Sequence, residues 1–200
     1  MIYFLRHAET DYNYRNIVSG RSDTSIRYKS FLLHNNQEFE LIYSSPSRRC
    51  VETISCLQNT SIVPKYDDRL LERYMGTLEG KSKNSIRNEF PKLFKEVNQK
   101  LYFNLFETPP GGESFYPFYE RVYSFYRECI MQKNNNILIC SHNQTLKMLF
   151  FIYTNIPITF DSWTRINIPN GEIIAMSDLI QYYELCRQYN NPLSVENINN

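Results

Sequence analysis

The stretch ILICSHNQTLKMLFF, residues 137–151, contains the pattern that decides the fold. Its first residues, Ile137 to Cys140, are continuously apolar, which is typical of a strand buried on both faces of a parallel sheet. The polar pair Ser141–His142 follows, and residues 144–154 are a helix candidate. The stretch therefore predicts a strand, a polar switch and a helix in immediate succession.

Two other segments show the same change from apolar to polar residues. Ile2 to Leu5 is a run of strand formers that ends at Arg6–His7, and Leu41 to Tyr43 ends at Ser44–Ser45. In an open α/β sheet, ligands bind at the carboxyl ends of the strands. We therefore expect these two polar pairs to face the same edge of the sheet as Ser141–His142.

The rest of the chain is expected to alternate between helices and strands. Apolar residues at helical spacing predict helices, and Pro, Gly and Asn predict where segments end. Helices are expected over residues 26–36, 46–57, 82–101, 113–132 and 179–189, a strand over 62–64, a hairpin of 165–168 with 172–176, and loops over 9–24 and 102–112. This order predicts one α/β domain over residues 1–200: a three-layer sandwich with a mostly parallel central sheet and helices on both faces.

The composition excludes several classes of protein. With 22 Lys and Arg against 21 Asp and Glu, the formal net charge is +1, so no overall positive field would hold nucleic acid or an anionic membrane. The longest apolar runs fall short of the ~20 residues that a membrane-spanning helix needs. The N-terminus lacks the basic flank and cleavage site of an export signal. We expect a soluble cytoplasmic protein that binds neither nucleic acid nor membrane.

Neither disulfide nor metal chemistry is expected. The five cysteines are scattered, without a C-x-x-C pair, so reduced thiols are the default. The three histidines, His7, His34 and His142, belong to no H-E-x-x-H motif, and no carboxylate-rich loop accompanies them. We therefore expect no metal and no cofactor, and we place His34 on the surface of a helix.

The strand ends carry residues suited to a phosphate group. Two histidines at the ends of two strands, with arginines beside them or one helical turn into the next helix, would form a cationic, nitrogen-rich pocket. The guanidinium group of arginine donates two parallel hydrogen bonds to phosphate oxygens. The residues therefore predict a site for a phosphate dianion.

Five segments occur in the order of a known family's motifs. They are LRHAETDYN (5–13), SSPSRRCVET (44–53), LLERYMGTLEG (70–80), PPGGES (109–114) and ICSHNQTL (139–146). Together they resemble the histidine phosphatase superfamily, which includes cofactor-dependent phosphoglycerate mutases, fructose-2,6-bisphosphatases and alpha-ribazole phosphatases. The resemblance covers about residues 1–176 and implies a phosphoglycerate mutase-like fold.

The resemblance assigns roles position by position. His7 matches the histidine that becomes phosphorylated, Glu72 the general acid, and His142 the second histidine of the family. Arg6 and Arg49 match the phosphate-binding arginines. Further candidates for lining the pocket or binding substrate are Asn13, Ser19, Gly20, Ser44, Glu113 and Asn143.

The implied reaction is hydrolysis of a phosphomonoester in two steps. His7 attacks phosphorus while the leaving oxygen takes a proton from Glu72, and water then cleaves the phosphohistidine. Positive charge from Arg6, Arg49 and His142 is expected to spread over the phosphoryl oxygens. The expected substrate is a small phosphorylated metabolite.

Several points stay open at this stage. Glu79 is the rival of Glu72 for the role of the acid, and residues 80–112 are expected to form a lid or insertion near the site. A homodimer is left open.

The branch of the family is not fixed by the motifs alone. Ala8 stands where the family usually has Gly, and Asn143–Gln144 where many phosphatases have Gly-Gly. Mutases carry adjacent arginines that hold the substrate carboxylate, but residues 102–108 contain none. This absence favours a phosphatase over the two alternatives, a cofactor-dependent phosphoglycerate mutase and a catalytically inactive binding relative.

Overall fold

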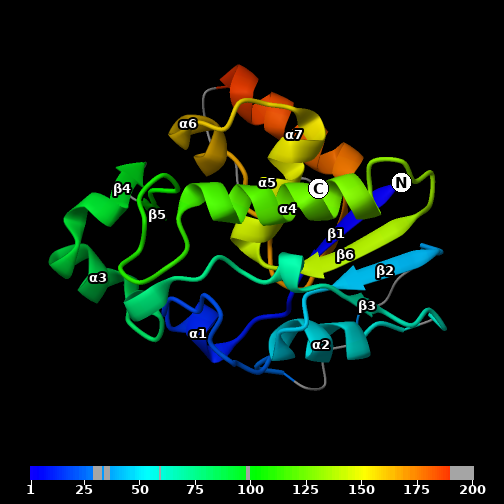
Figure 1. Ribbon diagram of the computed structural model, residues 1–200, viewed down its shortest axis with the longest axis horizontal. Coiled ribbons are helices and arrows are strands. Elements are labelled where there is room, and N and C mark those ends of the chain that lie inside the picture. Colours follow the sequence, from blue (N-terminus) through cyan, green and yellow to red (C-terminus); the bar gives the residue numbers. More distant parts are fainter. Residues whose placement is uncertain (29–32, 34–36, 59, 98–99, 190–200) are drawn as a thin grey trace.

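The computed structural model of the chain describes residues 1–28, 33, 37–58, 60–97 and 100–189. Within these residues, a central sheet has five strands in the order β3-β2-β6-β1-β7 (Figure 1). The strands are β1 (Ile2–Arg6), β2 (Leu41–Ser44), β3 (Lys65–Tyr66), β6 (Ile137–Ser141) and β7 (Ile173–Ala175). The first four are parallel, and β7 pairs antiparallel with β1.

Helices cover both faces of this sheet. Figure 1 shows α4 and α7 on one side and α2 on the other. The α-helices are α1 (Asp11–Tyr14), α2 (Arg48–Ser55), α3 (Lys83–Glu89), α4 (Phe115–Cys129), α5 (Asn143–Thr154), α6 (Phe160–Thr164) and α7 (Met176–Tyr189). The predicted mostly parallel sheet with helices on both faces is therefore confirmed.

Strand β6 explains how the two faces acquire separate cores. Successive side chains of a strand point to opposite faces. Ile137 and Ile139 pack with apolar residues of α4, α5 and α7, whereas Leu138 and Cys140 pack with residues of α2. All five residues of β6 are buried, as its continuously apolar sequence predicts.

The predicted helix over 82–101 is wrong beyond Glu89. Helix α3 ends there, and Pro91 follows, which cannot continue a helix. After the 3-10 turn Pro91–Leu93, the chain forms an antiparallel hairpin of β4 (Phe94–Val97) and β5 (Lys100–Phe103). Leu93, Phe94 and Phe103 pack in a small separate core with Met75, Leu78 and Ile86.

The predicted hairpin around Pro169–Asn170–Gly171 is also wrong. Only residues 173–175 form a strand, and their partner is β1 rather than residues 165–168. Asn170 makes an isolated bridge to Arg6. The sequence of a turn predicts only local pairing and cannot show that a strand distant in the sequence, here β1, is the partner instead.

The remaining differences concern short elements. Helix α1 lies in the predicted loop 9–24, where Thr10 and Asn13 form a capping box. Helix α6 begins with a second capping box, at Thr159, and the short strand β3 lies just beyond the predicted 62–64. Most of the helix expected over 26–36, and His34, lie outside the described residues.

No helix in the described part of the chain has the length and apolar character needed to cross a membrane.

Candidate active site

Pairing of the parallel strands brings the three predicted polar pairs together. Arg6 lies opposite Ser141 in the register of β1 and β6, and the backbone N–H of His7 donates to the Ser141 carbonyl at 3.0 Å. The backbone N–H of Ser45 donates to the Cys140 carbonyl at 2.9 Å. The ring centres of His7 and His142 are 5.3 Å apart. The predicted meeting of these pairs at one edge of the sheet is confirmed.

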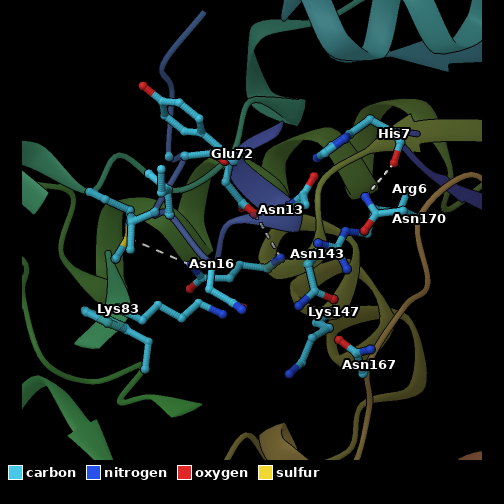
Figure 2. A pocket seen from close by; sticks show the side chains of 18 of the residues that line it. Arg6, His7, Asn13, Asn16, Glu72, Lys83, Asn143, Lys147, Asn167 and Asn170 are labelled. Atoms are coloured by element: carbon cyan, nitrogen blue, oxygen red, sulfur yellow. Dashed lines mark hydrogen bonds between the residues drawn. The ribbon is translucent and has the colours of Figure 1, made fainter. Parts of the chain in front are cut away.

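A cavity of about 380 Å³ opens at this edge (Figure 2). Most of the predicted site residues line it: Arg6, His7, Asn13, Ser19, Gly20, Arg49, Glu72 and Asn143. Three others, Ser44, Glu113 and His142, do not belong to its lining. The structure thus brings the proposed nucleophile, acid and arginines to one cavity.

The surroundings of His7 define it as a neutral imidazole in which Nε2 carries no proton. Its Nδ1 lies 2.8 Å from the Ala8 carbonyl, and because a carbonyl only accepts, Nδ1 carries the proton. Burial, then the charges of Arg49 and Arg6, hold the pKa of His7 well below its usual range. Nothing in the described residues forms a hydrogen bond with Nε2, whose lone pair is therefore available for attack.

Arg6 retains unused capacity to bind an anion. Its Nη1 donates to the Ile168 carbonyl at 2.8 Å, but its buried Nε has no hydrogen-bond partner within the described structure. Burial lowers the pKa of Arg6 to about 10, so the side chain stays charged at neutral pH. A buried, charged donor without a partner is costly unless a ligand satisfies it.

Arg49 is used differently from the expectation. Its Nη2 donates to the Gly20 carbonyl at 2.7 Å and its Nη1 to the Ser22 carbonyl at 2.8 Å. Both Nε and Nη2 donate to Nδ1 of His142, at 3.2 and 2.9 Å. Its N–H groups are thus engaged by the protein, and Arg49 supplies charge to the cavity rather than free donors.

His142 differs from its expected role as a positive group. Because Nδ1 accepts from Arg49, the proton lies on Nε2, which donates to Ser45 Oγ at 3.0 Å. Burial and the charge of Arg49 hold the pKa of His142 well below its usual range. In this arrangement His142 is neutral and positions Arg49.

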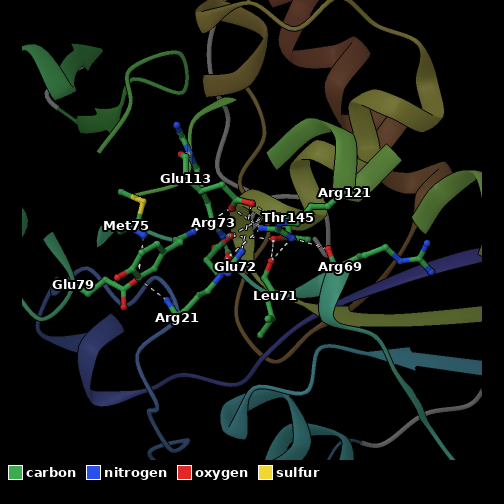
Figure 3. Close-up of polar contacts among 11 residues, drawn as sticks. Arg21, Arg69, Leu71, Glu72, Arg73, Met75, Glu79, Glu113, Arg121 and Thr145 are labelled. Carbon is green, nitrogen blue, oxygen red and sulfur yellow. Dashed lines mark hydrogen bonds and ion pairs between the residues drawn. The ribbon is translucent and has the colours of Figure 1, made fainter. Parts of the chain in front are cut away.

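Glu72 is fixed at the N-terminus of α5. Its Oε2 accepts from the backbone N–H of Gln144 at 3.2 Å, and its Oε1 accepts from the N–H and the hydroxyl of Thr145 at 3.2 and 3.1 Å (Figure 3). Its own carbonyl accepts from Arg21 and Arg121. These contacts give the carboxyl group a single defined position in the cavity wall.

Glu79 lies outside the cavity lining. Its Oε1 accepts from the backbone N–H groups of Arg21 and Met75 at 2.8 and 3.0 Å. A Cβ at Gly20, whose φ is +49°, would collide with this carboxylate. Glu79 therefore shapes the loop around Gly20, and Glu72 is the acid that the geometry favours.

The carboxylate of Glu113 makes ion pairs and a hydrogen bond within the protein and does not line the cavity. Its carboxylate pairs with Arg121 at 2.7 Å and with Arg21 at 3.4 Å, and it accepts from the Tyr74 N–H at 3.3 Å. The charge of Arg121 contributes to a pKa of Glu113 below its usual range. The geometry therefore does not support the expected substrate contact.

The sequence analysis missed several cavity residues. Two are lysines, Lys83 and Lys147, and others are amides and aromatic residues: Asn16, Asn167, Asn170, Phe94, Tyr102, Phe103 and Trp163. Lys147 could have been found, because it is the only charged residue in the otherwise apolar stretch 146–153. Burial lowers its pKa to about 7. Asn167 and Asn170 carried no signal, since Asn is common in turns.

The chain is similar in sequence to known phosphatases and phosphoglycerate mutases. The sequence model of the histidine phosphatase superfamily (branch 1) matches residues 2–178. The chain is 28% identical over 206 residues to a protein assigned as phosphoserine phosphatase 2 of Hydrogenobacter thermophilus, covering 92% of this chain and 96% of that protein. It is 26% identical to a 2,3-bisphosphoglycerate-dependent phosphoglycerate mutase of Cytophaga hutchinsonii, covering 74% and 75%.

Solved structures share the fold. A mycobacterial glucosyl-3-phosphoglycerate phosphatase aligns with a TM-score of 0.68 at 20% identity, covering 86% of this chain and 90% of that one. The alpha-ribazole phosphatase of Shigella flexneri aligns with a TM-score of 0.66 at 20% identity, covering 86% and 87%. At these identities the likeness concerns the fold alone.

The two buried neutral histidines predict a loss of stability in mild acid. Since their pKa values are lower in the folded than in the unfolded chain, unfolding takes up protons, and stability falls as the pH drops below ~6.5. We expect each histidine to contribute up to about 1.4 kcal/mol per pH unit there. Urea unfolding between pH 7.5 and 5.5 measures this slope.

The matched variant for this measurement is His142→Gln, which should remove about half of the slope. Wild-type stability that does not change over this range would contradict the neutral state of both rings.

Proposed function

The chain belongs to the histidine phosphatase superfamily (branch 1), and from this membership we propose that it hydrolyses phosphomonoesters through a phosphohistidine on His7. The observation that carries the proposal is the state of His7: Nδ1–H is fixed on the Ala8 carbonyl at 2.8 Å, which leaves Nε2 unprotonated in the cavity. Beside it, Arg6 offers a buried donor without a partner in the described structure. An unprotonated imidazole nitrogen beside an arginine N–H that has no protein partner suits nucleophilic attack on a phosphate group.

In the first step, Nε2 of His7 forms a bond to phosphorus and the bond to the leaving oxygen breaks. The carboxyl group of Glu72 gives its proton to that oxygen. The guanidinium of Arg6 binds phosphoryl oxygens directly. Arg49 adds positive charge to the site, while its N–H groups stay bonded to the protein. Such charge, fixed before the reaction, is usually the largest contribution to transition-state stabilisation.

In the second step, water attacks phosphorus and the bond to Nε2 breaks. The Glu72 carboxylate takes a proton from the attacking water, so that both groups return to their starting states. Asn170 supports His7 throughout, since its Nδ2 donates to the His7 carbonyl at 2.7 Å. The cycle needs only the phosphomonoester and water.

The cavity favours a small metabolite and hydrolysis over mutase activity. A volume of about 380 Å³ is at the small end of the range for small-molecule sites. The segment 102–108 contributes Tyr102 and Phe103 to the cavity and contains no arginine. An aromatic wall in place of adjacent arginines supports a phosphatase.

We expect His7→Ala to abolish phosphate release. The substrates to test are p-nitrophenyl phosphate, fructose bisphosphates, phosphoglycerates and alpha-ribazole phosphate, each with EDTA present, because the proposed cycle needs no metal. A His7→Ala protein that keeps the wild-type rate would rule out the mechanism. Interconversion of phosphoglycerates stimulated by 2,3-bisphosphoglycerate would instead support a mutase.

Glu72→Gln should slow hydrolysis of an alkyl phosphate by roughly 10²–10⁴-fold, because the alkoxide leaving group needs a proton. The effect on p-nitrophenyl phosphate should be much smaller, since p-nitrophenolate leaves without protonation. The comparison uses kcat/KM on both substrates, which reports only the steps through formation of the phosphohistidine, with Glu79→Gln as the matched control. Equal losses on the two substrates, or a larger leaving-group effect in Glu79→Gln, would remove Glu72 as the acid.

A further inference from the structure

Lys147 lies in the cavity but takes no part in the two steps proposed above. It projects from α5 and is only 3% exposed. Its Nζ lies 4.6 Å from the centre of the Trp163 ring, and within the described structure this ammonium donates no hydrogen bond. A cation–π contact compensates for only part of the hydration free energy that a charged amine loses on burial. Burial lowers the pKa of this group to about 7, and an anionic ligand beside Nζ would favour its charged form.

The carboxylates that line the cavity do not supply that partner. Glu72 is bound by the backbone N–H groups of Arg73, Gln144 and Thr145. Glu9 pairs with Arg27 at 3.4 Å. Neither forms an ion pair with Lys147, so the positive charge at this end of the cavity is not neutralised by the described chain.

Other donors surround the same space. Asn143 lies one helical turn before Lys147 on α5, and Figure 2 shows both side chains, with Asn167, along one wall of the cavity. The Oδ1 of Asn143 accepts from the Ile168 N–H at 3.3 Å, which directs its amide donors elsewhere. Lys83 reaches the cavity from α3 on the opposite side. The Lys147 amine and two amides thus line one wall of the cavity, and the Lys83 amine lies on the opposite side.

We propose that this second subsite, formed by Lys147, Trp163, Asn143, Asn167 and Lys83, binds a second anionic group of the substrate. The inference rests on the proposed function, because it takes the scissile phosphate to lie at His7 and Arg6. The second group is a carboxylate or a second phosphate, since both present oxygens that accept from ammonium and amide donors. The Trp163 ring lies 4.6 Å from Nζ of Lys147 and so forms part of the wall beside this amine.

The test compares substrate pairs that differ only in the second anion. 3-Phosphoglycerate against glycerol 3-phosphate examines a carboxylate, and fructose 1,6-bisphosphate against fructose 6-phosphate examines a phosphate. In at least one pair, the wild-type protein should prefer the member with two anionic groups. Lys147→Met should raise KM for that member by roughly ten- to hundred-fold, the value of one charge-assisted hydrogen bond. The kcat values, and the KM of the member with a single phosphate group, should change less than about three-fold.

Lys95→Met is the matched control. Lys95 also lies over an aromatic ring, that of Phe160 at 4.8 Å, but does not line the cavity. This variant should leave all four KM values unchanged. If Lys147→Met weakens both members of each pair equally, or if the wild-type protein discriminates within neither pair, the second subsite is disproved.

Binding keeps this test separate from the proposed function. Isothermal titration calorimetry of the same four compounds with His7→Ala and with His7→Ala/Lys147→Met, neither of which should turn substrate over, measures binding alone. A preference of His7→Ala for the member with two anionic groups, lost in the double variant, would support the subsite even if the wild-type protein hydrolysed no substrate. An absence of hydrolysis would count against the phosphatase alone, and circular dichroism checks that the variant is folded.

Discussion

The parallel pairing of β1 with β6 is the constraint on which the rest of the site depends. Its register sets Arg6 opposite Ser141, so the residues that follow, His7 and His142, must lie side by side although the chain between them forms most of the fold. Strand β2 on the other side of β6 adds Ser45. Hydrogen bonds of the sheet thus set the positions of the two histidines along the chain, and neighbouring side chains then hold them.

Burial determines how charge is distributed around that pair. His7 and His142 are both neutral because each is buried beside arginine, so the permanent positive charge at the site comes from Arg6 and Arg49. Arg49 donates hydrogen bonds to the Gly20 and Ser22 carbonyls and to His142. Arg6, in contrast, has one N–H without a partner in the described structure, and this N–H can bind a ligand. The two arginines therefore differ: Arg49 organises the cavity wall, and Arg6 retains an N–H without a partner in the described structure.

The sequence was most informative where structure is local. Apolar runs that end in polar residues located β1, β2 and β6, and the motifs located His7, Arg49 and Glu72. The rest depends on tertiary contacts. Pro91 and packing in a small separate core give the hairpin β4–β5 where a helix was predicted. Residues 173–175 pair with β1 instead of forming the predicted hairpin. The neutral state of His142 and the second subsite depend on side chains brought together by folding, which no spacing reveals.

The most direct test of this account is to identify the phosphorylated atom. Protein labelled with ¹⁵N-histidine would be quenched in alkali during turnover and examined by ³¹P and ¹⁵N NMR. Because Nδ1–H of His7 is held by the Ala8 carbonyl, the account predicts one phosphohistidine, with phosphorus on Nε2 of His7. Phosphorus on Nδ1, on another residue, or on no residue during steady hydrolysis would contradict it.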